Sequence, residues 1–127
     1  MNDHDDRAPF EEGLEARRRV LGAEHVDRSL GRASDFDREF QRMVTSYCWG
    51  TVWTGTALSD RQRSLNNLCL LAALNRMPEF ELHFRAALRN GCTEDELRET
   101  LVQIAVYAGI PAGVEAFRIA RKVLDEG

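Results

Sequence analysis

Two capping boxes most constrain what this chain can fold into. They are Ser59-Asp-Arg-Gln62 and Thr93-Glu-Asp-Glu96. In a capping box the two side chains satisfy backbone N–H groups that the first helical turn leaves unpaired, so each box predicts a helix start. We expect one helix over residues 59–75 and another over residues 93–108, with Gly109 ending the second.

Proline and glycine mark the remaining helices of the second half. Pro78 and Pro111 suit the first turn of a helix, and Gly91 ends the helix that Pro78 opens. In the first half we expect helices over residues 9–21, 24–30 and 34–49. No segment alternates as a strand does. The pattern predicts an all-α, single-domain helical bundle of six to seven helices that spans residues 1–127, with residues 1–7 flexible.

Composition and charge exclude several kinds of partner. The net charge is −4, whereas a nucleic-acid binder usually carries a basic face, so no nucleic-acid partner is expected. The three cysteines form no C-x-x-C pair and have no histidines at zinc-ligand spacing, which predicts no metal site and suits a reducing compartment. The polar, acidic start is unlike a signal peptide, and the longest apolar run, residues 68–74, is too short to cross a membrane. We expect a cytoplasmic protein with no membrane partner.

Two helices carry more apolar surface than a chain of 127 residues can readily cover. Residues 65–74, LNNLCLLAAL, are apolar on almost every side, and the last helix carries two apolar rows. A helix that is apolar on every side must be covered on every side. We therefore predict a homo-oligomer, and a central helix buried within one subunit is the alternative.

His83 is the first candidate for chemistry. In the helix PEFELHFRAALRNG it lies at the edge of the buried stripe, and Glu79 lies one turn earlier in the same row. A carboxylate at that position can fix the tautomer of the imidazole and raise its pKa, which prepares a general acid near neutral pH. A helix-surface ion pair, or a half-buried histidine bonded to the backbone, would have the same spacing.

Aromatic and basic residues form two further candidate groups. Tyr47, Trp49 and Trp53 fall in or next to WGTVWTGTALS, which we interpret as an ordered loop whose rings either wall a pocket or pin the loop to the helices. Arg61 and Arg63 fall in the first turns of a helix, where cations oppose the helix dipole. They either face a carboxylate-bearing ligand or are simply exposed.

Three stretches in this order resemble the 4-carboxymuconolactone decarboxylases of the β-ketoadipate pathway. They are YCWGTVW, RSLNNLCLLAALNR and ELHFRAALRNGCTEDELRETLVQIAVYAGIPAGVEAFRIA. The resemblance runs over residues 14–123 and includes an H-x-x-x-A-L-x-N-G-x-T core that begins at His83. One departure is Thr54-Gly55-Thr56, where the family pattern suggests Arg-Pro-Gly, and it leaves the shape of the aromatic loop open.

The resemblance implies an alkylhydroperoxidase D-like helical fold, assembled as a homo-oligomer and commonly a hexamer, that needs no metal or organic cofactor. The wider superfamily carries C-x-x-C-x-x-x-H. Aligned on His83, that motif places Arg76 and Glu79 where the two cysteines would be. Thiol-dependent peroxidase chemistry needs both thiols, so it is not expected here.

The implied reaction is decarboxylation of 4-carboxymuconolactone to β-ketoadipate enol-lactone in protocatechuate catabolism. His83, oriented by Glu79, would deliver the proton. Arg63, or less readily Arg61 or Arg85, would bind a carboxylate. The three aromatic residues would wall the site. The alternatives are a related enzyme that acts on another lactone, a thiol oxidoreductase, and a binding module without turnover.

Overall fold

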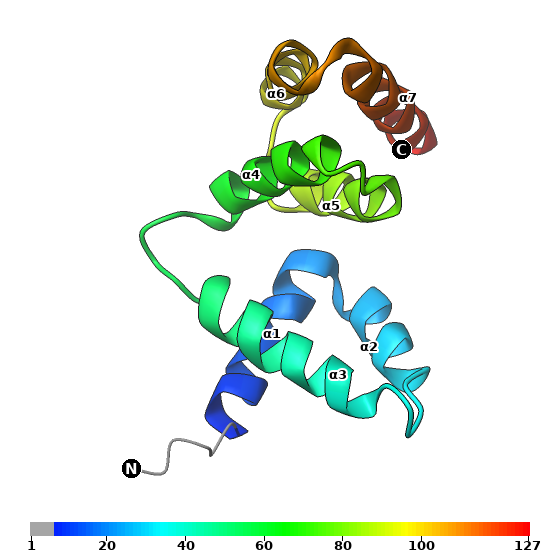
Figure 1. Ribbon diagram of the computed structural model, residues 1–127. Helices are drawn as coiled ribbons and strands as arrows, with labels where there is room; N and C mark the ends of the chain where they lie inside the picture. Colours follow the sequence, from blue (N-terminus) through cyan, green and yellow to red (C-terminus); the bar gives the residue numbers. More distant parts are fainter. Residues whose placement is uncertain (1–6) are drawn as a thin grey trace. The chain divides into compact units, whose positions relative to one another are not determined.

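The computed structural model describes residues 7–127, and every regular element of this part of the chain is helical (Figure 1). This confirms the all-α prediction. The elements are α1 (Arg7–Leu21), α2 (Ala23–Gly31), α3 (Arg38–Met43), the π-helix η1 (Val44–Val52), α4 (Asp60–Ala73), α5 (Met77–Arg89), α6 (Glu94–Ala108) and α7 (Ile110–Glu126). Of the segment expected to be flexible, residues 1–6 lie outside the described part, and Arg7 is the first residue of α1. The chain forms two compact units, one up to Leu58 and one from Ser59 onward.

The helix expected over residues 34–49 differs at both ends. It begins at Arg38, because Ser34 and Asp37 instead form a turn in which the Ser34 N–H donates to the Asp37 carboxylate at 2.7 Å. At the other end α3 continues into η1, so residues 49–52 are helical and the expected loop begins only after Trp53. Figure 1 shows the two helices as one continuous rod.

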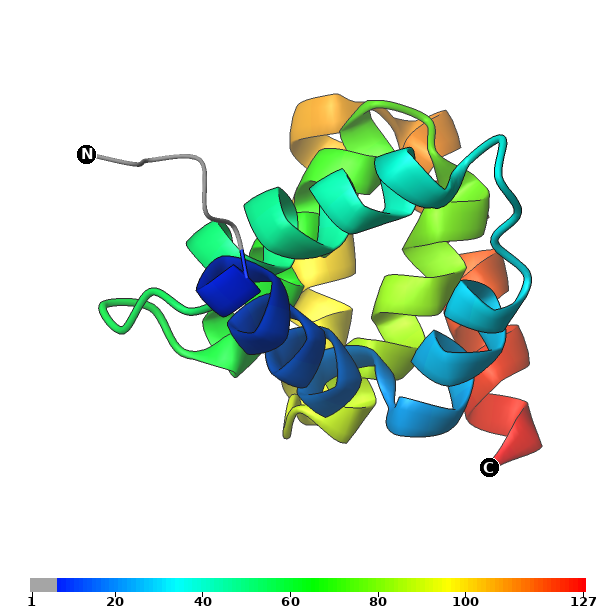
Figure 2. The same cartoon turned by 90° about the horizontal axis from the view of Figure 1, so that it is seen from below.

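Glycines let α1 and η1 pack closely in the first unit. A Cβ atom on Gly13 would overlap the carbonyl oxygen of Thr45, and one on Gly50 would overlap the carbonyl oxygen of Pro9. Only hydrogen fits in both places, so the two backbones pack in direct contact. Figure 2 shows α1 crossing this rod from a second direction. The face of η1 toward this contact holds Thr45 and Trp49, both buried.

The second unit begins its helices where the sequence predicted. Ser59 caps α4 by accepting the Gln62 N–H at 3.0 Å, and the complete capping box of Thr93 and Glu96 opens α6. Pro78 and Pro111 lie in the first turns of α5 and α7. Each signal acts within a few residues of its own helix start, which is why it could be recognised without knowing the tertiary structure.

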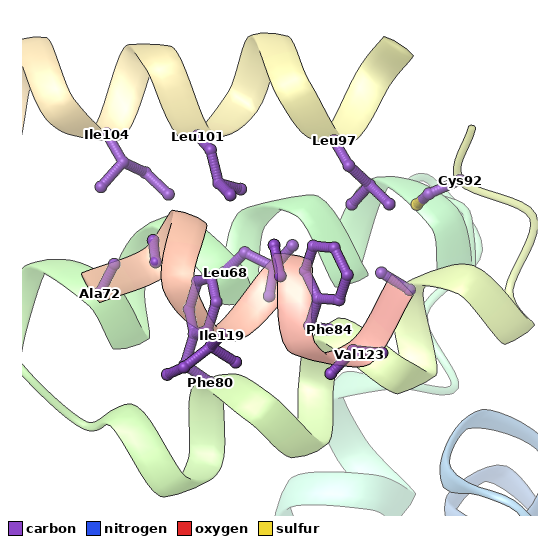
Figure 3. Packing of buried hydrophobic residues seen from close by; sticks show 13 residues of the cluster. Leu68, Ala72, Phe80, Phe84, Cys92, Leu97, Leu101, Ile104, Ile119 and Val123 are labelled. Carbon is purple, nitrogen blue, oxygen red and sulfur yellow. The ribbon is translucent and has the colours of Figure 1, made fainter. Parts of the chain in front are cut away.

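One apolar core joins the four helices of this unit. Leu97, Leu101 and Ile104 on α6 point toward Leu68, Phe80 and Phe84 on α4 and α5, and toward Ile119 and Val123 on α7 (Figure 3). Phe80 and Phe84 are fully buried and stack at 6.2 Å between ring centroids. Burying a phenylalanine side chain contributes about 1.5–3 kcal/mol, so this cluster fixes how α5 is turned.

Other apolar side chains of the second unit are exposed on the single chain. Tyr107, at 85% exposure, is the most open, and the others are Leu70, Leu74, Val102, Val106, Ile110, Val114 and Phe117. Exposed apolar side chains that gather into a large patch are typical of interaction surfaces. They include members of both sequence stretches that predicted self-association, which stays a prediction.

Candidate active site

His83 lies on α5 beside Asn67 of the neighbouring helix α4. The two helices run antiparallel, with Cys92 near the carbonyl of Arg61 at 3.7 Å and the Asn90 amide donating to Ser64 at 3.1 Å. Further along the same seam the Asn67 Nδ2 atom lies 3.5 Å from Nδ1 of His83. The imidazole is half-buried. The seam therefore fixes which side chain of α4 the histidine meets.

In this orientation the amide of Asn67 favours one tautomer of the histidine. An amide nitrogen can only donate, so with Nδ2 toward the ring the Nδ1 atom must accept. The neutral imidazole then carries its proton on Nε2. Sequence reasoning missed Asn67. The sequence feature that could have pointed to Asn67 is a polar side chain within the apolar stretch LNNLCLLAAL, four residues after Arg63.

Glu79 acts on His83 through its charge alone. Its Oε2 atom pairs with Arg76 at 3.2 Å, and its Oε1 atom is buried without a hydrogen bond. The pKa of Glu79 is lowered by its own backbone N–H and by Arg76. Of these two side chains it is Asn67, and not Glu79, that lies within hydrogen-bond distance of Nδ1 of His83.

The pKa of His83 moves in the opposite direction from the one predicted. Burial lowers it from 6.5 to about 4, and the charge of Glu79 offsets only part of that. The sequence shows the carboxylate one turn away but not the apolar surroundings, so the expected rise was wrong. At neutral pH the ring of the ligand-free protein is uncharged.

The three arginines proposed to bind a carboxylate have different surroundings. Arg61 is exposed and forms an ion pair with Glu96. Arg85 is exposed and binds both Glu81, at 2.9 Å, and Glu126, at 2.6 Å. These carboxylates raise its pKa.

Arg63 is the one of the three whose charge is not neutralised. It is half-buried, its Nε atom makes no hydrogen bond, and no carboxylate of the described residues pairs with it. It precedes Asn67 by one helical turn and shares its face of α4. Arg63 is therefore the strongest of these candidates.

The three aromatic candidates all belong to the first unit, but Tyr47 does not lie with the two tryptophans. Trp49 and Trp53 are each 6% exposed and stack with ring centroids 5.0 Å apart. The carbonyl oxygen of Trp53 accepts from Arg19 at 3.4 Å. Tyr47 is exposed instead and lines a separate hollow with Phe36, Phe40 and Met43. The helical path of η1 places the phenol on a different side from the indoles.

The second unit also has a groove of about 470 Å³, lined by residues of α5, α6 and α7. Its lining suits proton transfer less well than the surroundings of His83 do. Its walls include Phe84, Leu97 and Phe117, and its charged residues are Glu94, Arg98, Arg121 and Asp125. Carboxylates and guanidinium groups share this rim, and its lining contains no histidine.

Among residues 7–127 no group of three or more histidine, cysteine or acidic side chains could hold a metal ion, and no helix is both long and apolar enough to cross a membrane.

Comparison with known proteins identifies the family. The model of the carboxymuconolactone decarboxylase family matches residues 38–122. The chain is 40% identical to 4-carboxymuconolactone decarboxylase of Acinetobacter baylyi over 121 residues, which are 95% of this chain and 90% of that protein. It is also 40% identical to nitrosuccinic acid decarboxylase of Metarhizium robertsii, over 98% of this chain and 87% of that protein. A 4-carboxymuconolactone decarboxylase of Pseudomonas putida matches 36% of this chain at 44% identity, over 96% of its own length.

The chain belongs to the carboxymuconolactone decarboxylase family. Its class of enzyme is therefore that of the carboxy-lyases. The resemblance noted in the sequence is confirmed over almost the whole chain.

Proposed function

We propose that this protein converts 4-carboxymuconolactone to β-ketoadipate enol-lactone in protocatechuate catabolism, without a cofactor and as a homo-oligomer such as a hexamer. The observation that carries the proposal is the setting of His83, a half-buried imidazole whose Nδ1 atom faces Asn67 of the neighbouring helix. The identity of 40% to the Acinetobacter enzyme over 95% of this chain supports the substrate.

The substrate itself takes up the electrons that decarboxylation releases. The bond between the ring carbon and its carboxylate breaks, CO2 leaves, and the electron pair moves through the C=C bond into the lactone carbonyl. The intermediate is a dienolate. A proton then adds to the carbon next to the carbonyl and gives the enol-lactone. The protein has to bind the second carboxylate, stabilise the developing oxyanion and supply this proton.

His83 supplies the proton from Nε2. In the charged ring Nδ1 also carries a proton and donates, so the Asn67 amide has to turn its oxygen toward the ring to accept it. Because the ligand-free pKa is about 4, the ring must gain its second proton when the dianionic substrate binds. A bound carboxylate and the charge of Glu79 both favour the imidazolium. Binding of a non-reacting dicarboxylate analogue should therefore take up a proton near pH 7, and calorimetry in two buffers of different ionisation enthalpy measures this directly.

Arg63 holds the carboxylate that the product retains. Its planar guanidinium can bind a carboxylate through two parallel bonds, and no carboxylate of the described residues occupies it. Arg85 and Arg61 remain less favoured because each already has an acidic partner. Trp49, Trp53 and Tyr47 are proposed as substrate contacts on the resemblance alone.

Nitrosuccinic acid is the second candidate substrate, because the Metarhizium relative matches with the same identity of 40%. Its chemistry is parallel. The carboxylate that leaves stands beside a nitro group that accepts the electron pair as a nitronate, and a second carboxylate remains. One imidazole that returns a proton to carbon could serve either reaction. Only the electron sink and the shape of the substrate differ.

Direct assays of the two substrates separate these functions. We expect the lactone to be consumed, with loss of its ultraviolet absorbance, and His83→Ala to lower the rate by about 10²–10⁴-fold while remaining folded. Arg98→Gln, which removes an exposed ion pair with Asp95, is the matched control and should leave the rate unchanged. If nitrosuccinic acid is turned over faster than the lactone, nitrosuccinic acid is the substrate and the proposed role of His83 is unchanged. Full activity of His83→Ala would remove the proposed proton donor.

A further inference from the structure

Ser64 on α4 is a fully buried polar side chain that lies between the two residues of this helix that the proposed function uses. It follows Arg63 directly and precedes Asn67 by three residues. The residue is 0% exposed, and its hydroxyl accepts a hydrogen bond from the side-chain amide of Asn90 at 3.1 Å, across the contact between α4 and α5. A buried hydroxyl without a partner is costly, so packings of α4 on α5 that break this bond are disfavoured.

Asn90 is held in place because it caps the C-terminal end of α5. Its backbone N–H donates to the carbonyl of Ala86 at 2.8 Å, and the chain then turns at Gly91, whose φ of 94° favours glycine. The N–H of Cys92 donates back to the carbonyl of Ala87 at 3.0 Å. The amide of Asn90 is therefore carried by a hydrogen-bonded helix end.

The hydrogen bond from Asn90 fixes how α4 is rotated about its own axis. Leu68 and Phe84 of the same two helices belong to the apolar core, whose contacts have little directional preference, whereas a hydrogen bond requires a defined distance and angle. Side-chain ends lie about 5–6 Å from a helix axis, so a rotation of α4 by about 10° would move the Asn67 amide by about 1 Å. This amide is already 3.5 Å from Nδ1 of His83, so a shift of that size away from the ring would break the contact.

We propose that Ser64 and Asn90 are positioning residues for the decarboxylation. Their hydrogen bond holds α4 in the rotation that places Asn67 beside His83 and fixes the direction in which Arg63 leaves the helix. Ser64 is too buried to touch a substrate, so it acts only through its neighbours on α4. A misplacement of about 1 Å in an active site can cost about 10²-fold in rate. The effect on rate rests on the proposed function, whereas the effect on the ring of His83 can be measured without a substrate.

The ring nitrogens of His83 test the positioning in the ligand-free protein. In Ser64→Ala and in Asn90→Ala the nitrogen chemical shifts of the ring should move away from their wild-type values, because Nδ1 loses the partner that the rotation of α4 holds in place. Ile104→Val, which removes one methylene group from the core on α6, is the control for a general loss of stability and should leave the ring spectrum unchanged. Ring spectra that keep the wild-type shifts in both alanine variants would overturn the proposal.

A double-variant cycle tests whether the two residues act through one bond. Each alanine variant should lower kcat/KM about tenfold or more, and the variant that carries both changes should lose no more than either single variant. Losses that multiply in the double variant would show two independent effects and refute the proposal.

Two further results keep this test decisive. If Ser64→Ala does not fold by circular dichroism, the ring spectrum of Asn90→Ala decides, because Asn90 is only half-buried. A wild-type protein that decarboxylates neither the lactone nor nitrosuccinic acid would remove the proposed function. The ring spectra would then still decide whether the bond between Ser64 and Asn90 places Asn67 beside His83.

Discussion

The side-chain amide of Asn67 on α4 faces the Nδ1 atom of His83 on α5 at 3.5 Å, whereas the carboxylate of Glu79 pairs with Arg76. A neutral amide and a carboxylate have different effects on an imidazole. An amide that turns its nitrogen toward Nδ1 favours the neutral tautomer with the proton on Nε2, whereas a bonded carboxylate would favour the charged ring. This difference leads to the first prediction.

Asn67→Ala should lower kcat with little change in KM, because the imidazole loses the donor that orients it. We expect a loss of about tenfold, smaller than for removal of His83 itself. Asn67→Asp should place the proton on Nδ1 and raise the pKa of His83. Nitrogen chemical shifts of the ring read both the tautomer and the pKa. Asn66→Ala, at an exposed neighbouring position, is the control. An unchanged ring spectrum in Asn67→Asp would show that the amide does not set the tautomer.

Acid should destabilise the protein through His83 at pH values well above the range in which its carboxylates titrate. The unfolded chain binds a proton at this residue near pH 6.5 and the folded chain only near pH 4, so the unfolded state holds more protons between these values. The free energy of unfolding therefore falls as pH is lowered through this window, by about 2 kcal/mol between pH 7.5 and 5. Denaturant titrations of the wild type and of His83→Gln at both pH values measure this. The variant should show the shallower dependence, and equal slopes would mean that the histidine is not held neutral by burial.

Gly13→Ala should unfold or severely loosen the first unit. The added methyl group would overlap the backbone of Thr45 in η1, which cannot move aside as a side chain can. We expect a loss of about 3 kcal/mol or more. Both tryptophans of the chain lie in this unit, so their fluorescence follows its unfolding. Gly31→Ala, where nothing lies within 4 Å of the new methyl group, is the matched comparison and should stay within about 1 kcal/mol of the wild type.

Val106→Glu should disrupt the predicted self-association. Val106 and Tyr107 are exposed on α6 of the single chain, and a carboxylate buried in an apolar contact would carry a large desolvation penalty. Light scattering coupled to size-exclusion chromatography should report a multimer for the wild type and smaller species for the variant. Glu99→Gln, an exposed polar position on the same helix, should keep the wild-type mass. A wild-type protein that elutes as a monomer at all concentrations would contradict the prediction.

The sequence determined the helix starts of the second half and, through resemblance, the family. The caps at Ser59 and Thr93 and the prolines at 78 and 111 act on groups within one helical turn, so their effect is visible without the fold. Glu79 was also visible at its spacing of four from His83. The sequence did not show which partner Glu79 would bind, because Arg76 lies three residues before Glu79 and competes with His83.

The tertiary structure decided what surrounds His83. The antiparallel register of α4 and α5 brings Asn67 to a residue 16 positions away, and no pattern along one helix encodes that register. The tertiary structure also decided the direction of the pKa shift of His83. Burial lowers this pKa by more than the charge of Glu79 raises it. Local hydrogen bonds act between near neighbours in sequence, whereas desolvation acts through everything packed around a group, and only the folded chain brings those atoms together.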